Sequence, residues 1–149
     1  MWPIPVASSV TPAGNAVIVH GTNDRVPGSD YPAWQCLVDD VVIRANGPVP
    51  FFENGFTLCQ DLDLDDGPHQ LVVNVITGTA GETFWFDDIQ YSPSPSSSES
   101  GGIPFVKVRS LDPAIVYSAG WGPFADVANM TSKTGAEVKF TFTGMYHAC

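Results

Sequence analysis

Hydrophobic and polar side chains alternate with a period of two in several segments of this chain. The clearest case is residues 137–143, where Val138, Phe140 and Phe142 face one side of a strand and Lys139 and Thr141 face the other. Such a strand buries one face of a sheet. The same pattern, bounded by turn-forming residues, predicts about nine strands, at 16–22, 33–38, 41–45, 56–60, 69–77, 83–91, 105–108, 115–118 and 137–143.

Helical periodicity is weak by comparison. No stretch of ten residues carries a capped apolar stripe, so the pattern predicts no long helix and at most one short helical turn at residues 124–129. The 14 glycines and 13 prolines recur at short intervals between the predicted strands. These features predict an all-β protein in which residues 1–149 form a single β-sandwich domain.

One segment interrupts this pattern. Residues 92–102, SPSPSSSESGG, contain no apolar side chain and are dense in Ser, Pro and Gly. Because such a segment buries nothing that would offset the entropy of ordering it, we expect a flexible linker between residues 14–91 and 103–144. Eleven residues span at most about 35 Å, which is enough to join neighbouring strand ends or to reach a second molecule.

The charge balance narrows the range of partners. The net charge is −10, with 6 Lys and Arg against 16 Asp and Glu. This excess argues against binding to nucleic acid or to anionic lipid, both of which need clustered cations. No apolar run approaches the roughly 18 residues that a membrane span needs, so we expect no membrane insertion. A neutral glycan or another surface protein is the expected partner.

Two cysteines lie within predicted strands. A disulfide between Cys36 and Cys59 would stabilise the fold by roughly 3 kcal/mol; the alternative is a pair of buried free thiols. Cys149 is expected to be free, or to cross-link two chains. Asn129 begins an Asn-Met-Thr triplet, an acceptor for N-glycosylation, which favours a secretory history.

Several phrases of the chain resemble a known family. Residues 31–40, 56–60, 65–75 and 83–91 resemble the second half of a β-sandwich module found in secreted and single-pass membrane proteins of mushroom-forming fungi. Residues 112–124 and 126–144 resemble the first half of that module. These modules are commonly tandem and similar to the galactose-binding-domain-like jelly roll. The resemblance therefore implies a jelly-roll β-sandwich at the cell surface or outside the cell.

The two halves occur in reversed order in this chain. Either the chain is a slice across two tandem modules, or 14–91 and 103–144 fold together as a circular permutant. We favour the permutant, because isolated halves would expose strand edges and apolar faces. A strand-swapped homodimer is the competing arrangement. Residues 1–5, MWPIP, lack the basic start and apolar run of a signal peptide.

Catalytic motifs are scarce. His20, His69 and His147 stand outside any GxSxG or HExxH motif, and no glycine-rich phosphate loop is found. We therefore expect no enzyme activity and no cofactor, and expect the histidines to be hydrogen-bonded structural side chains. An enzyme would need two carboxylates, or a nucleophile and a base, converging in one cleft.

The acidic run at residues 61–66 begins like a calcium loop. Gly67 comes one place late, however, and Val72 stands where the bidentate Glu should be. We expect a solvated turn and predict no metal site, although calcium in another geometry, involving Asp39 or Asp40, stays open.

Glycan recognition by a sandwich requires exposed aromatic rings with polar groups beside them. Tyr31 and Trp121, in turn-rich segments, are the predicted ligand-binding residues, whereas Trp34 and Trp85 lie within strands and are assigned to the core. The leading hypothesis is a non-catalytic binding or adhesion module for cell-wall carbohydrate. A structural spacer domain without a ligand is the alternative, and a hydrolase is a distant third.

Overall fold

The protein is an all-β sandwich. The computed structural model describes residues 15–23, 32–47, 52–65, 67–78, 82–92 and 105–143, and these contain strands and turns but no helix. The twelve strands are β1 (Asn15–Asn23), β2 (Ala33–Val38), β3 (Val41–Val42), β4 (Arg44–Ala45), β5 (Glu53–Leu64), β6 (Pro68–Ile76), β7 (Phe84–Tyr91), β8 (Val106–Arg109), β9 (Val116–Tyr117), β10 (Gly122–Phe124), β11 (Ala128–Thr131) and β12 (Glu137–Thr143).

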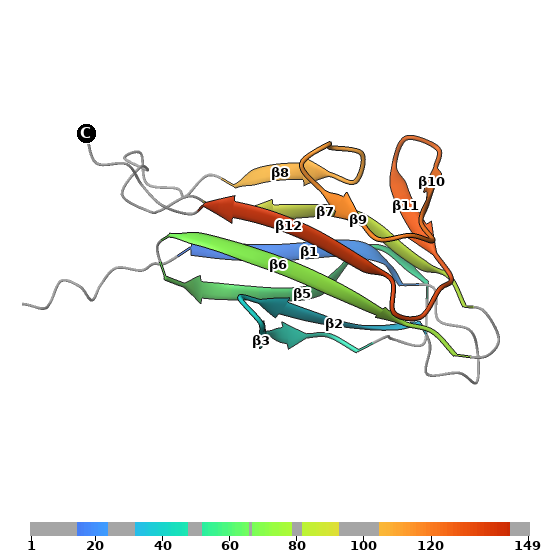
Figure 1. Ribbon diagram of the computed structural model, residues 1–149, viewed down its shortest axis with the longest axis horizontal. Coiled ribbons are helices and arrows are strands. Elements are labelled where there is room, and N and C mark those ends of the chain that lie inside the picture. Colours follow the sequence, from blue (N-terminus) through green and yellow to red (C-terminus); the bar gives the residue numbers. More distant parts are fainter. Residues whose placement is uncertain are drawn as a thin grey trace, which may run out of the picture.

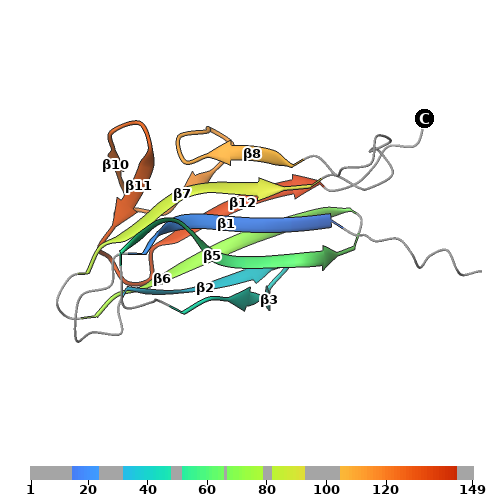
Figure 2. The same ribbon diagram turned by 180° about the vertical axis from the view of Figure 1, so that it is seen from behind.

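The strands form two antiparallel sheets that pack face to face (Figure 1). The smaller sheet has the order β3-β2-β6-β12-β9 and faces the viewer in Figure 1. The larger sheet has the order β10-β11-β7-β1-β5-β4, with β8 also paired to β7, and faces the viewer in Figure 2. The predicted β-sandwich class is therefore confirmed.

The core lies between the two sheets and follows the period-two pattern. In β12, Val138, Phe140 and Phe142 are buried while Lys139 and Thr141 are exposed, as the alternation predicts. The facing strand β7 contributes Phe84 and Phe86, which are almost completely buried. Burying each of these aromatic side chains contributes about 2 to 3 kcal/mol, so the inward faces of these strands supply much of the stability.

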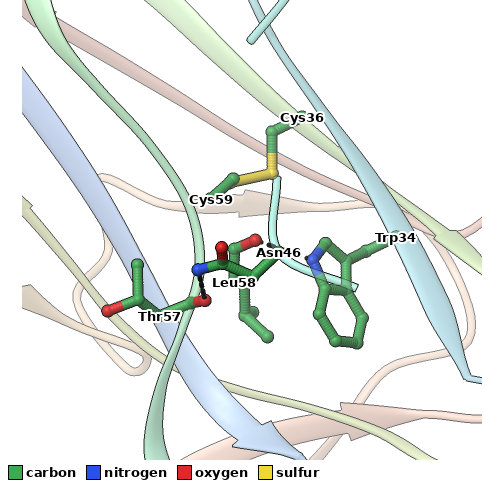
Figure 3. Close-up of a disulfide and its surroundings, with 6 residues drawn as sticks. All are labelled: Trp34, Cys36, Asn46, Thr57, Leu58 and Cys59. Carbon is green, nitrogen blue, oxygen red and sulfur yellow. Dashed lines mark hydrogen bonds between the residues drawn. A yellow bond between two sulfur atoms is a disulfide. The ribbon is translucent and has the colours of Figure 1, made fainter. Parts of the chain in front are cut away.

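A disulfide joins the two sheets through this core. Cys36 of β2 and Cys59 of β5 are both fully buried, and their sulfur atoms are bonded (Figure 3). The predicted pairing is thus present, and it connects one sheet to the other rather than two strands of one sheet. Beside it, the indole Nε1 of Trp34 donates a 2.8 Å hydrogen bond to the carbonyl oxygen of Leu58. Trp34 is a core residue, as predicted.

Strands from the C-terminal part of the chain complete both sheets. β12 pairs along its length with β6, from Glu137 opposite Asn74 to Thr143 opposite Pro68. β8 and β11 pair with β7 in the other sheet. Within this single chain, residues 105–143 therefore supply neighbours to strands of residues 15–92. In a strand-swapped homodimer the same pairs would form between two chains, and solution mass under reducing conditions distinguishes the two.

One edge of β7 pairs with β1, and the opposite edge is shared by two short strands. Phe84 to Phe86 pair with β11, whereas Asp88 to Tyr91 pair with β8. The two partners separate at Asp87, whose carbonyl oxygen accepts a hydrogen bond from the backbone N–H of Ser110. Figure 1 shows β8 and the β10–β11 hairpin as separate projections beside β7. This division of one edge leaves a space over β7 between β8 and the β10–β11 hairpin.

The sequence pattern located the strands better than it located the turns. Each of the nine predicted segments contains strand, although 41–45 breaks at Ile43 and 56–60 extends to Glu53–Leu64. The short helical turn that the pattern allowed at 124–129 is not found; residues 125–127 are instead the turn of the β10–β11 hairpin, whose two strands were not among the predicted nine. Ser92, the first residue of the expected linker, is buried and accepts a hydrogen bond from the Ala16 N–H. Residues 93–102 lie outside the described residues.

Candidate functional site

A pocket lies on the outward face of the seven-stranded sheet, where β8 and β11 separate. Its volume is about 640 Å³, within the usual range for small-molecule sites. We call it the Trp85 pocket; the described residues that line it are Thr22, Phe52, Asn54, Trp85, Asp87, Asp88, Lys107, Arg109, Phe124, Asp126, Val127 and Ala128.

A bulge in β7 places two carboxylates in this pocket. His20 of β1 pairs with Asp88, but the next residue, Gly21, pairs with Phe86, so Asp87 is the extra residue between them. A bulge changes the direction of side chains along a strand. As a result, Asp87 and Asp88 both line the pocket, while Phe86 and Ile89 on either side of them point into the core.

Gly21 allows β7 to approach β1 at this point. A Cβ atom on Gly21 would lie 2.2 Å from the Trp85 carbonyl oxygen and 2.7 Å from the Leu58 side chain. Both distances are shorter than van der Waals contact, so a side chain there would push the strands apart. The absence of one at Gly21 therefore helps to set the position of Trp85.

An aromatic pair forms one wall of the pocket. Trp85 from β7 and Phe124 from β10 meet edge to face, with ring centroids 4.8 Å apart. Phe124 and Phe52 are about half exposed or more, so apolar ring surface is open to a ligand. The Trp85 Nε1 is buried and finds no hydrogen-bond acceptor among the described residues. An unpartnered donor of this kind gains a hydrogen bond when an acceptor reaches it.

The polar wall contains charges of both signs. Asp88 Oδ1 lies 2.9 Å from His20 Nδ1, and Asp88 Oδ2 lies 3.8 Å from Lys107 Nζ. The Thr22 hydroxyl lies 3.0 Å from Asn54 Oδ1 and 3.4 Å from Asp87 Oδ2. The wall therefore offers carboxylate oxygens that accept hydrogen bonds and amine, amide and guanidinium groups that donate them.

Asp87 differs from its neighbour in forming no salt bridge among the described residues. Burial raises the pKa of its carboxyl group above the usual value of 3.8, and the adjacent charge of Asp88 raises it further. Hydrogen bonds from Thr22 and the backbone of Gly55, together with the charge of His20, oppose this increase without cancelling it. Asp87 is thus the pocket carboxylate that gains most from a new donor.

The sequence analysis placed the ligand at other aromatic residues. Tyr31 lies outside the described residues. Trp121 lines a smaller pocket of about 340 Å³ beside Met130 and Thr131, and its ring packs against Phe84 and Tyr117 of the interior. The structure does not bring Trp121 into the Trp85 pocket, and its role as a ligand residue stays a prediction.

Trp85 was assigned to the core, and that assignment was wrong. Phe84 and Phe86 face inward, so the residue between them must face outward. Strict alternation along residues 83–91 could have shown this. The bulge at Asp87, by contrast, left no signal that sequence periodicity alone could detect.

The predicted glycosylation residue faces the interior. Asn129 is 7% exposed, and its Nδ2 donates a 3.4 Å hydrogen bond to the Ser110 carbonyl oxygen. The Tyr117 hydroxyl donates to the same oxygen at 2.6 Å, and burial raises the pKa of Tyr117 to about 12. A glycan on Asn129 would require this side chain to leave that cluster, so its attachment stays a prediction.

The histidines that the structure describes have acidic partners. His20 lies against Asp88, and His69 is held between Asp39 and the Asp65 carbonyl oxygen. This matches the expectation of hydrogen-bonded structural side chains, while His147 lies outside the described residues. Among the described residues there is no cluster of three or more His, Cys, Asp or Glu side chains able to hold a metal ion. Asp39, an alternative calcium ligand in the sequence analysis, instead accepts hydrogen bonds from His69 and Gln70.

No helix in the described part of the chain is both long and apolar enough to cross a bilayer. The disulfide is compatible with an extracellular protein. Comparison of the chain with protein-family models, with curated proteins and with solved structures found no match.

Proposed function

We propose that this protein is a non-catalytic binding or adhesion module that recognises carbohydrate in the Trp85 pocket. The observation that carries the proposal is the combination of Trp85 and Phe124 with Asp87, Asp88 and Arg109 around one cavity. Aromatic rings pack against the apolar C–H faces of a sugar ring. Carboxylates accept hydrogen bonds from its hydroxyls, and the guanidinium donates to its oxygens.

The resemblance to fungal surface modules supports the same proposal. A galactose-binding-like jelly roll, assembled from two half-modules in permuted order, is the finer fold class that we propose for this sandwich. An extracellular or cell-surface location in a mushroom-forming fungus follows from the same resemblance. The proposed ligand is then cell-wall carbohydrate.

Single substitutions test the location of the site. We expect saturable binding on a glycan array, followed by a loss of about tenfold or more in affinity for Trp85→Ala, since a buried aromatic contact is worth about 1 to 3 kcal/mol in such sites. Trp121→Ala is the matched control, because it removes an indole that lines the smaller pocket. If Trp121→Ala abolishes binding and Trp85→Ala does not, the ligand site is the one predicted from the sequence.

A glycoside hydrolase is the second candidate, because such an enzyme needs two carboxylates in one cleft and the Trp85 pocket contains more than one. Asp87, Asp88 and Asp126 line one pocket, and the raised pKa of Asp87 is the property that a general acid needs. We prefer binding, because Asp87 and Asp88 are neighbours on one strand and Asp88 is held by His20 and Lys107. Release of reducing ends from a bound oligosaccharide, lost in Asp87→Asn, would favour the hydrolase.

The spacer alternative predicts no ligand at all. An array on which no glycan binds saturably, together with no shift of the unfolding temperature by any oligosaccharide, would favour it over both proposals.

A further inference from the structure

The charges in the Trp85 pocket do not balance. The described lining contains three carboxylates, Asp87, Asp88 and Asp126, and two permanent cations, Lys107 and Arg109. Lys107 and His20 both lie against Asp88. Asp87, by contrast, forms no salt bridge among the described residues: it accepts hydrogen bonds from two neutral donors, the Thr22 hydroxyl and the backbone of Gly55, and the charge of nearby His20 acts on it without direct contact.

Partial burial makes this imbalance significant. A carboxylate that has lost much of its water gains more from a cationic partner than an exposed one does, because the local dielectric is low. A ligand ammonium group placed on Asp87 would form a charge-assisted hydrogen bond, which is about twice as strong as a bond between neutral groups. The Asp, Lys and Arg side chains of the described lining would then be balanced by the ligand.

The neighbouring rings favour the same kind of group. Trp85 and Phe124 lie in the same lining as Asp87, and the faces of aromatic rings attract ammonium groups. Asn54, Lys107 and Arg109 remain available to hydrogen-bond hydroxyl oxygens around the amine. A lysine side chain of a protein partner has an amine but no such hydroxyls, so it would leave these groups unused.

We propose that the pocket selects carbohydrate bearing a free amine, that is, amino-sugar residues without an N-acetyl group, and that Asp87 receives the ammonium. This rests on the proposed function of the same pocket and specifies its substrate class. N-acetylation of the sugar converts its ammonium group into a neutral and bulkier amide, so the pocket should no longer prefer that sugar over an uncharged one.

Calorimetric titration of the full chain tests the proposal with three oligosaccharides of equal length: glucosamine, N-acetylglucosamine and glucose oligomers. We expect the glucosamine oligomer to bind at least about tenfold more tightly than the other two, the value for one charge-assisted hydrogen bond. In Asp87→Asn this ratio should fall close to one, because the variant loses the charge that distinguishes the glucosamine oligomer from the other two.

A charge-matched control separates the pocket from general attraction to an acidic protein. Asp63→Asn removes the same charge from an exposed position on β5 outside the pocket lining, and it should leave the ratio unchanged. An equal fall of the affinity ratio in Asp63→Asn and Asp87→Asn would overturn the inference. Equal binding of all three oligomers would also overturn it, but the proposed carbohydrate site would then stand. Equally tight binding of a lysine peptide would assign the pocket to a protein partner, and no binding of any oligosaccharide would remove both proposals.

Discussion

His69 Nδ1 lies 2.6 Å from Asp39 Oδ2, while His69 Nε2 lies 2.6 Å from the Asp65 carbonyl oxygen. Because both ring nitrogens face acceptors, the ring is best accommodated as a doubly protonated imidazolium. His69 lies at the start of β6. Its ring therefore connects the β2–β3 turn, through Asp39, with the end of β5, through Asp65. This arrangement gives the fold a dependence on pH.

Stability should be greatest in mildly acidic solution. Burial by itself would lower the pKa of His69, but the hydrogen bonds and charges of Asp39 and Asp65 outweigh it and raise that pKa above 6.5. The resulting stability is fully present below 6.5 and is lost as pH rises through the raised value. The pKa of Asp39 is lowered despite its desolvation, chiefly by its hydrogen bond to His69, so its contribution is lost only as pH falls through a value below 3.8.

Denaturant unfolding across this range measures the effect. The wild-type chain should lose stability as pH rises above 6.5, and His69→Gln should be less stable at pH 6 but show a flatter profile above it. An identical slope in the variant would assign the pH dependence to other groups.

The β2–β3 turn, which contains the His69 partner Asp39, offers a stabilising substitution. Asp39 and Asp40 form the two-residue β2–β3 turn, and both have positive φ, 53° and 69°. Turns of this kind prefer glycine at the second position. We expect Asp40→Gly to raise the free energy of unfolding by up to about 1 kcal/mol, the approximate cost of the left-handed conformation. Asp39→Gly, which also removes the His69 partner, should instead destabilise the protein.

The strand elements were predictable because burial repeats every second residue in 33–38, 69–77 and 137–143. The pairing of Cys36 with Cys59 followed from their placement in strands. The ligand pocket was not predictable in the same way. It depends on an extra residue at Asp87 and on which strand occupies each half of the β7 edge, and both are set by tertiary packing rather than by local periodicity.

Removing the disulfide should destabilise the fold without changing its architecture. Cys36 and Cys59 are separated by 23 residues in sequence, and the loop they close predicts a loss of roughly 3 kcal/mol in the double variant Cys36→Ala/Cys59→Ala. Chemical unfolding measures this loss. An unchanged unfolding midpoint would show that sheet packing alone restrains the loop between β2 and β5.

Replacing Gly21 should affect both stability and binding. Gly21→Ala places a methyl group against the backbone of Trp85, which cannot move without shifting β7. We expect a loss of about 2 kcal/mol from overpacking and weaker glycan binding through displacement of Trp85. Gly122→Ala is the control, since a Cβ there meets nothing within 4 Å, and it should stay within about 0.5 kcal/mol of wild type. Equal effects of the two substitutions would contradict the close approach of β1 and β7.

The indole N–H signals of the four tryptophans provide the most direct test of the proposed site. In a two-dimensional ¹⁵N–¹H spectrum titrated with the best-binding oligosaccharide, the Trp85 signal should shift saturably, with the same dissociation constant as calorimetry gives. The Trp34 signal, whose N–H is bonded to Leu58 in the core, should stay unchanged. Saturable binding that leaves the Trp85 signal in place and moves the Trp121 signal would contradict our assignment of the ligand to the Trp85 pocket.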